Sequence, residues 1–353
     1  MSVLTKKALT EKLGKVSSIL ILNWGLLGDV FIRVPLIEAI RRRFPQAKIV
    51  VVVDPFAVAV LQNHPDVDEV IPFSRVKHPR LKYISETFKN LMALRKRRFD
   101  LLINLYCGGS SARFSRIINA DMRLSFNHTA ELRRANNVQV PHPSFSGNWT
   151  KALGTMLQPL GIHDQAIRRG SSFFCTEEAI ERAKSRLAGV PARLVGFNLG
   201  AGVEEKRWPV ERFVALAKHI HDRFGFAPLV FTNPGMEDLS AEFERQYAHY
   251  SQIIVAPLVA LDEVGALMCE CDYIVTADTS LMHLAFGLKR PTLVLFTFTR
   301  PEMVAPEDVE FASCFVESKS GAEYCGKPAG SVDIPVEQAM SQFEKLVAIV
   351  QVN

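Results

Sequence analysis

The sequence predicts an α/β fold made of two Rossmann-like domains. Short β-branched segments alternate with longer amphipathic segments, which is typical of parallel sheets covered by helices. This alternation starts twice along the chain, once in each half. The length of 353 residues also accommodates about two domains, at roughly 150 residues for each. We therefore expect two separate sheets rather than one large sheet.

In the first half, three segments are nearly all apolar and are expected to be strands buried on both faces. These segments are residues 19–23, 49–53 and 101–105. A helix is expected over 31–44, because apolar residues recur there at helical spacing and Pro45 then interrupts the pattern.

The second half repeats this arrangement of strands and helices. The expected strands are residues 194–199, 229–232, 273–276 and 291–296. The expected helices are residues 210–224, 236–247, 261–271 and, near the end of the chain, 335–350. The predicted domains are therefore residues 1–165 and 176–334, with a C-terminal helix within 335–353. Gly, Arg, Ser and Phe interrupt the periodicity between 161 and 176, where the join is expected.

Charge is divided unevenly along the chain, although the net charge is only +5. Residues 1–176 contain 26 Lys+Arg and 12 Asp+Glu (+14), whereas residues 177–353 contain 16 and 25 (−9). This division indicates two surfaces with chemically different partners. No zinc-finger spacing or RNA-binding motif accompanies the basic half, so nucleic acid is not an expected partner. The basic runs 41–43 and 95–98 are interpreted as solvated helix faces.

The sequence also indicates a cytoplasmic protein. No apolar run approaches the ~20 residues that span a bilayer, and the N-terminal segment lacks the apolar core of a secretory signal. The six cysteines are too few and too scattered for a disulfide scaffold, so a reducing compartment is expected.

Gly28 and Asp29 follow the first expected strand and precede a helix. Glycine allows a tight turn near a ligand, and a helix N-terminus attracts anions. Asp29 is either a helix cap or a catalytic carboxylate, and spacing alone favours neither. The segment is not G-x-G-x-x-G, so a dinucleotide site is only weakly supported.

A second candidate segment places small residues after a strand and a lysine before the next helix. The small residues are Gly200, Ala201 and Gly202, and the lysine is Lys206. Backbone amides in such a turn bind phosphate oxygens, and a lysine neutralises their charge. The alternative is a glycine-rich turn followed by a solvated Lys-Arg pair.

A third candidate segment begins where the strand 273–276 runs into a helix. Asp278, Thr279 and Ser280 lie at the carboxyl end of a parallel strand, where open α/β sheets bind ligands. Helix capping and a buried helical His283 are the alternatives, but the cluster as a whole favours an oxyanion site. In a fourth segment, Glu237 either bonds a ribose hydroxyl or interacts with a helix dipole.

In this order, the four segments resemble glycosyltransferase family 9, the ADP-heptose:lipopolysaccharide heptosyltransferases. The resemblance runs from Ile19 to about Pro306 and includes NHPDVDEVI at 63–71 and KRWPVERF at 206–213. Its most specific part is DTSLMHLA at 278–285, which is similar to the family's D-[ST]-x-x-M-H-L-A block.

The resemblance implies a GT-B fold, in which two Rossmann-like domains face each other across a cleft. It implies no metal and no cofactor, an acceptor glycolipid on the N-terminal domain, an ADP-sugar donor on the C-terminal domain and a last helix that crosses back. Asp29 would be the general base, and Lys206 would stabilise the departing diphosphate. Gly28 and Arg33 would lie on the acceptor side. The implied donor-binding residues are Gly200, Ala201, Gly202, Glu237, Leu258, Val259, Asp278, Thr279, Ser280, Met282 and His283.

Three blocks depart from the family pattern. The family's H-P-G-A is NLGA at 198–201, and its G-G-P-G-D-E turn is TNPGME at 232–237. Its F-G-P-T-x-P block is FTFTRP at 296–301, which places Thr297 and Phe298 in a loop near the donor. These departures leave the identity of the transferred sugar open.

We expect an inverting glycosyltransferase that moves heptose from ADP-heptose to a lipopolysaccharide inner-core acceptor. It would lie at the inner face of the bacterial inner membrane, with its basic half toward the anionic glycolipid. The alternatives are another nucleotide sugar or a natural-product acceptor, and a non-catalytic GT-B binding protein. The missing dinucleotide fingerprint disfavours a nicotinamide-dependent oxidoreductase.

Overall fold

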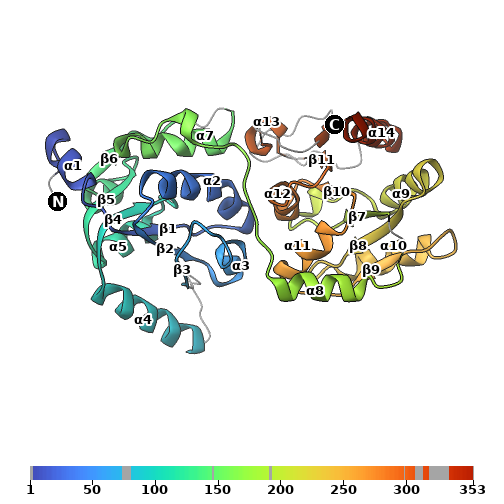
Figure 1. The fold of residues 1–353 in the computed structure, drawn as a ribbon, viewed down its shortest axis with the longest axis horizontal. Coiled ribbons are helices and arrows are strands. Elements are labelled where there is room, and N and C mark those ends of the chain that lie inside the picture. The colour runs from blue at the N-terminus through green and yellow to red at the C-terminus, as the bar shows by residue number, and fades with distance from the viewer. Residues whose placement is uncertain are drawn as a thin grey trace. The chain divides into compact units, whose positions relative to one another are not determined.

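The structure is a computed structural model that describes residues 3–73, 81–144, 147–190, 193–297, 299–306, 313–317 and 334–352. The chain divides into two compact units, Met1–Ser171 and Ser172–Asn353. Each unit contains one six-stranded sheet with helices packed around it (Figure 1). Phe298, singled out in the sequence, lies outside the described residues.

The first unit has the strand order β3-β2-β1-β4-β5-β6, and its described strands pair in parallel. The strands are β1 (Ser18–Leu22), β2 (Lys48–Val53), β3 (Glu69–Pro72), β4 (Arg98–Asn104), β5 (Asn119–Phe126) and β6 (Val138–Val140). The helices are α1 (Lys6–Leu13), α2 (Leu27–Arg43), α3 (Val58–Leu61), α4 (Leu81–Lys96), α5 (Gly109–Ile117), α6 (Ala130–Ala135) and α7 (Trp149–Gly154).

The second unit has the strand order β9-β8-β7-β10-β11-β12, also with parallel pairing. The strands are β7 (Leu194–Asn198), β8 (Ala227–Phe231), β9 (Ile254–Ala256), β10 (Tyr273–Ala277), β11 (Thr292–Phe296) and β12 (Ser313–Glu317). The helices are α8 (Glu177–Arg186), α9 (Val210–Phe224), α10 (Glu237–Tyr247), α11 (Leu261–Cys269), α12 (Ser280–Gly287), α13 (Pro301–Val304) and α14 (Val336–Val352).

Both units therefore have the 3-2-1-4-5-6 strand order of a Rossmann fold. The predicted α/β fold with two Rossmann-like parts is confirmed. In this order the chain direction across the sheet reverses between β1 and β4, and again between β7 and β10. Open α/β sheets bind ligands beside such a reversal, at the carboxyl ends of the strands. The topology therefore predicts one ligand-binding position in each unit, at the carboxyl ends of the strands beside the chain reversal.

Several elements differ from the sequence expectation for identifiable reasons. Helix α2 begins at Leu27 rather than at residue 31, because the Asp29 carboxylate accepts a hydrogen bond from the N-cap backbone, Leu26 N, and so stabilises an earlier first turn. Strands β3, β5, β6, β9 and β12 were not expected. Strands β3, β6 and β9 are only three or four residues long, β5 is interrupted by Asp121 and Arg123, and β12 has three apolar residues between Ser313 and Glu317.

Helix α14 packs on β11, β12 and α9 of its own unit. Ala339, Phe343 and Leu346 carry this contact and are fully buried in the core of the second unit. The predicted passage of this helix back to the first domain stays a prediction.

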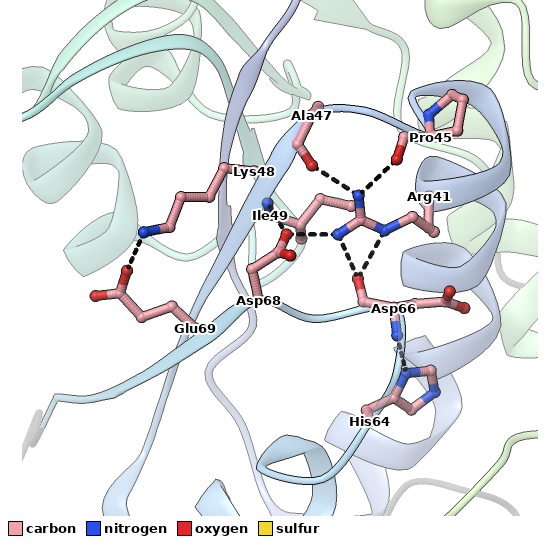
Figure 2. Close-up of polar contacts among 9 residues, drawn as sticks. All are labelled: Arg41, Pro45, Ala47, Lys48, Ile49, His64, Asp66, Asp68 and Glu69. Atoms are coloured by element: carbon pink, nitrogen blue, oxygen red, sulfur yellow. Dashed lines mark hydrogen bonds and ion pairs between the residues drawn. The ribbon is translucent and has the colours of Figure 1, made fainter.

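In the arginine run of α2, Arg42 and Arg43 are exposed as the sequence indicated, whereas Arg41 is not solvated. The Arg41 side chain is only 16% exposed, and its guanidinium binds the loops before β2 and β3 (Figure 2). Its partners are Asp66 O (3.3 Å), Pro45 O (3.2 Å), Ala47 O (2.7 Å) and Asp68 Oδ2 (2.5 Å). Arg42 and Arg43 donate to the carbonyl oxygens of Ala166 and Leu160. Arg41 therefore ties together the loops at the amino-terminal edge of β2 and β3, and Arg42 and Arg43 tie α2 to the segment 160–166.

We expect Arg41→Ala to lower the free energy of unfolding by about 2–3 kcal/mol, because buried carbonyl groups lose a charged donor. Chemical denaturation followed by fluorescence measures this change. The matched control is Arg95→Ala, which removes an exposed arginine of α4 and should change stability little. An unchanged unfolding transition together with a raised acceptor KM would instead place Arg41 on a ligand-binding surface.

Glu263 links helix α11 to helix α8 in the second unit by ion pairs. Its carboxylate accepts hydrogen bonds from Arg186 Nε (2.5 Å) and Arg182 Nε (2.9 Å), and its side chain is 8% exposed. Burial raises the pKa of Glu263, but the two arginines outweigh burial and hold it below its ordinary value of 4.5. A depressed carboxylate pKa stabilises the fold above pH 4.5, and this contribution disappears as the pH falls through the lower value.

Glu263→Gln should therefore lower the free energy of unfolding by about 1–3 kcal/mol at pH 7, because the charged partner is lost. The difference from wild type should shrink as the pH is lowered below 4.5. Thermal unfolding across this pH range measures both effects. Glu181→Gln, in an exposed pair with Lys184, is the control and should change little at either pH. A pH-independent difference would contradict the ionic contribution.

Candidate functional site

In the second unit, the predicted site residues follow neighbouring strands at the carboxyl edge of the sheet. The turn after β7 holds residues 199–206, and the segment after β10 begins at Asp278. The segments after β11, β8 and β9 lie farther along the same edge. Residues separated by up to 100 positions in the sequence are therefore brought to one edge by parallel pairing.

Lys206 and Asp278 form an ion pair at the centre of this edge. Lys206 Nζ lies 2.6 Å from Asp278 Oδ1 and also donates to Thr299 Oγ1 at 3.2 Å. The second carboxylate oxygen, Asp278 Oδ2, accepts from the Thr299 backbone N–H at 2.8 Å. The Lys206 side chain is 18% exposed and the Asp278 side chain only 4%, so the lysine is the more exposed member of the pair. This arrangement presents a positive charge to a ligand while the carboxylate stays fixed.

Asn198 connects the turn after β7 with the segment after β10. Its Nδ2 donates to Thr276 Oγ1 at 2.8 Å and to Thr279 Oγ1 at 3.0 Å. Thr279 is the N-cap residue of α12, and its side chain makes no capping hydrogen bond to the described residues. The first turn of a helix presents backbone N–H groups that suit an anion. Thr279 and Ser280 are partly exposed, so their hydroxyls are accessible.

The glycine-rich turn after β7 is packed against the turn after β8. A Cβ on Gly200 would lie 2.7 Å from Asn233 Cγ, so the close approach of these turns requires glycine. Ala201 is buried and Gly202 is exposed. Glu237 is exposed, and its Oε1 accepts from Gly235 N at 3.0 Å. Hydrogen bonds from backbone N–H groups, including that of Gly235, lower the pKa of Glu237, which is therefore ionised at neutral pH.

Met282 and His283 lie on the buried side of α12. Met282 packs against Phe286, Val294 and Phe296 in an apolar cluster. Burial, followed by the nearby charge of Lys206, lowers the pKa of His283 to about 4, so its imidazole is neutral at pH 7. In contrast, Leu258 after β9 is 51% exposed, and Val259 is partly exposed. The structure thus places the first two residues beneath the site and the last two on the surface.

In the first unit, Asp29 lies just after the carboxyl end of β1, at the chain reversal. It is the N3 residue of α2, and its Oδ2 accepts from Leu26 N at 3.0 Å. No other hydrogen bond to this carboxylate is found among the described residues, and the side chain is partly exposed. Gly28, the residue before it, is also partly exposed. The carboxylate therefore starts the helix with one oxygen and offers the other to a ligand.

Arg33 lies one helical turn beyond Asp29 and contacts the loop after β1. Its Nη1 donates to Trp24 O at 2.5 Å and to Asn23 Oδ1 at 3.3 Å. Gly25 in this loop has φ +143°, and a Cβ there would lie 2.8 Å from Asp29 Oδ2. Glycine therefore permits the loop to close over the carboxylate and the guanidinium.

Three residues were not predicted as part of the site. Asn198 opens the second candidate segment and Thr299 matches the threonine of the family's F-G-P-T-x-P block, but their side-chain contacts depend on which strands are neighbours. Asp54 follows β2 and accepts from Gly25 N at 3.1 Å, which fixes the loop around Asp29. An acidic residue directly after a buried strand is the signal that identifies it.

Two features are absent from the residues that the structure describes. None of their helices combines the length and apolar character that a bilayer crossing requires. No group of three or more His, Cys, Asp or Glu side chains is arranged there to hold a metal ion. The predicted independence from metals and cofactors stays a prediction.

Comparison with known proteins gives consistent results. A model of glycosyltransferase family 9 (heptosyltransferase) matches residues 88–324. Lipopolysaccharide heptosyltransferase 3 of Escherichia coli is 23% identical over 276 residues, which cover 77% of this chain and 81% of the relative. The predicted resemblance to this family is confirmed.

Solved structures share the fold of the whole chain. A glycosyl transferase of family 9 from Veillonella parvula superposes with a TM-score of 0.83 at 24% identity, covering 94% of this chain and 97% of the other. The E. coli ADP-heptose lipopolysaccharide heptosyltransferase II gives a TM-score of 0.78 at 21% identity, covering 95% and 99%. The predicted GT-B fold is therefore confirmed.

Proposed function

The chain belongs to glycosyltransferase family 9 and is a glycosyltransferase, and we propose that it transfers heptose from ADP-heptose with inversion at the anomeric carbon. The observation that carries this proposal is the contact between Lys206 and Asp278, with the Thr279 hydroxyl beside it at the chain reversal of the second sheet. A cation, a fixed carboxylate and free helix N–H groups match a sugar diphosphate.

On the donor side, Lys206 binds the diphosphate and stabilises the charge that develops as it leaves. The backbone of Gly200, Ala201 and Gly202 contacts the same phosphates, together with Thr279 and Ser280. Asp278 binds hydroxyl groups of the transferred sugar. Leu258 and Val259 cover the adenine, and Glu237 binds the ribose hydroxyls. Met282 and His283 support the donor site from below, because both lie on the buried side of α12.

On the acceptor side, Asp29 removes the proton from the attacking hydroxyl. The sugar–diphosphate bond breaks while the new glycosidic bond forms, and the proton goes to the carboxylate oxygen that does not cap α2. Arg33 and Gly28 shape the acceptor side of this carboxylate. Its relatives include lipopolysaccharide heptosyltransferases, which supports a lipopolysaccharide inner-core acceptor. Such an acceptor also supports a peripheral position at the cytoplasmic face of the inner membrane.

Titration and transfer assays test this proposal. Calorimetry with ADP, UDP and NAD should give binding of ADP alone. Incubation with ADP-heptose and defined truncated cores should give a glycosylated core, and NMR should show the anomeric configuration opposite to that of the donor. Binding of NAD without ADP, or transfer only from another nucleotide sugar, would contradict the proposal.

A further inference from the structure

Asn198 lies at the end of β7 and is completely buried, with 0% of its surface exposed. Three oxygen atoms surround its Nδ2 nitrogen. They are Thr276 Oγ1 at 2.8 Å, Thr279 Oγ1 at 3.0 Å and Gly200 O at 3.5 Å. The orientation of this buried amide therefore determines whether the neighbouring hydroxyl groups accept or donate a hydrogen bond.

Two neighbours fix the orientation of the Asn198 amide. Gly200 O is a carbonyl oxygen and can only accept a hydrogen bond. The Thr276 hydroxyl gives its own proton to Ala277 O at 2.9 Å, so it must accept from Asn198. The NH2 group of the amide therefore faces both of them; its two hydrogens point to the nearer oxygens, Thr276 Oγ1 and Thr279 Oγ1, and Gly200 O is a longer contact at 3.5 Å. Asn198 Oδ1 therefore faces away from these three oxygen atoms. It is buried and has no hydrogen-bond partner among the described residues.

The orientation of Asn198 determines what the Thr279 hydroxyl does. Because this hydroxyl accepts an N–H from Asn198, its own proton is directed away from the amide. Thr279 is the N-cap residue of α12, yet its side chain makes no capping hydrogen bond. The proton is therefore available to a group outside the protein, at the helix end where an anion is favoured.

We infer that Asn198 is a positioning residue that fixes the Thr279 hydroxyl as a hydrogen-bond donor to a diphosphate oxygen of the donor substrate. The inference rests on the proposed function, since it takes the bound anion to be the diphosphate of an ADP-sugar. Asp278, next to Thr279, is held by Lys206 and by the Thr299 backbone. A cation and an oriented hydroxyl therefore flank the end of the same strand.

Asn198→Asp tests the inference, because it keeps the size of the side chain and replaces both N–H donors by an acceptor. The Thr279 proton should then turn toward the new carboxylate. Calorimetry should show ADP binding weakened by about ten- to hundredfold, the effect of losing a hydrogen bond to a charged group. Thr279→Val should weaken it to a similar degree. Combined with Thr279→Val, the uncharged variant Asn198→Leu should weaken ADP binding no further than Thr279→Val alone, because its effect acts through the Thr279 hydroxyl.

Asn136→Asp is the matched control. Asn136 is also 0% exposed, donates Nδ2 to Leu132 O at 2.7 Å and has a buried Oδ1 with no hydrogen-bond partner, but it lies in the first unit. This variant should lose thermal stability like Asn198→Asp while keeping wild-type affinity for ADP. In steady-state assays, the Asn198 and Thr279 variants should raise the donor KM and leave the acceptor KM unchanged.

The outcomes separate this inference from the proposed function. Wild-type affinity in Asn198→Asp or in Thr279→Val overturns the inference and leaves the proposed function standing. Additive losses in the double variant also overturn it. A wild-type protein that does not bind ADP overturns the proposed function and the inference with it. If Asn198→Asp does not fold, Thr279→Val leaves the buried amide in place and still decides whether the hydroxyl binds the diphosphate.

Discussion

Asp29→Asn should lower kcat by about 10²–10⁴-fold, because the amide cannot take the proton of the attacking hydroxyl. The Asn oxygen can still accept from Leu26 N, so α2 should begin at the same residue and the fold should be retained. The donor KM should change little, because the proposed donor site lies on the second unit. Steady-state kinetics with both substrates varied measures the two parameters separately.

Asp121→Asn is the matched control for the base. Asp121 lies near the amino end of β5, at the edge of the same sheet opposite to Asp29, and pairs with Arg98 at 3.0 Å. Its substitution should leave kcat unchanged. An Asp29→Asn variant that keeps most of its turnover would assign proton removal to another group.

Lys206→Met should lower kcat by about 10²–10³-fold and raise the donor KM, because the charge of the leaving diphosphate loses its stabilising cation. The same change should lower the stability of the free protein by about 1–3 kcal/mol, since it leaves the buried Asp278 carboxylate without its ionic partner. Kinetic assays and thermal unfolding of the free protein measure the two effects.

A double variant separates these effects of Lys206. In Lys206→Met with Asp278→Asn, no buried charge is left unpaired, so the unfolding temperature should recover while activity stays low. Lys184→Met is the control, since it removes an exposed lysine of α8 that pairs with the exposed Glu181. Full recovery of activity in the double variant would mean that Lys206 serves the fold rather than the diphosphate.

Local sequence signals predicted the central elements of the fold well. Helix α9 was expected over 210–224 and is observed there, because Pro209 precedes it and Gly225 ends it with φ +73°. The central strands β1, β2, β7 and β10 were predicted because they are buried on both faces. Strands β3 and β6 are less regular in burial and gave a weaker pattern.

The contacts that were missed are those between distant parts of the chain. Arg41 was interpreted as solvated, although its partners lie up to 27 residues away. The roles of Asn198 and Thr299 depend on β10 lying between β7 and β11, which no local pattern reveals. Motif order was sufficient to identify the family, because its most specific block lies on one strand–helix junction at 278–285.

Each unit is built from one continuous stretch of chain, with the boundary after Ser171. The N-terminal sheet therefore has all its strands once that stretch has left the ribosome, and it can fold before the second half is synthesised. This order matters for parallel sheets, because their strands pair over long sequence separations and form slowly. Vectorial folding during synthesis thus keeps the equivalent strands of two similar sheets from pairing with each other.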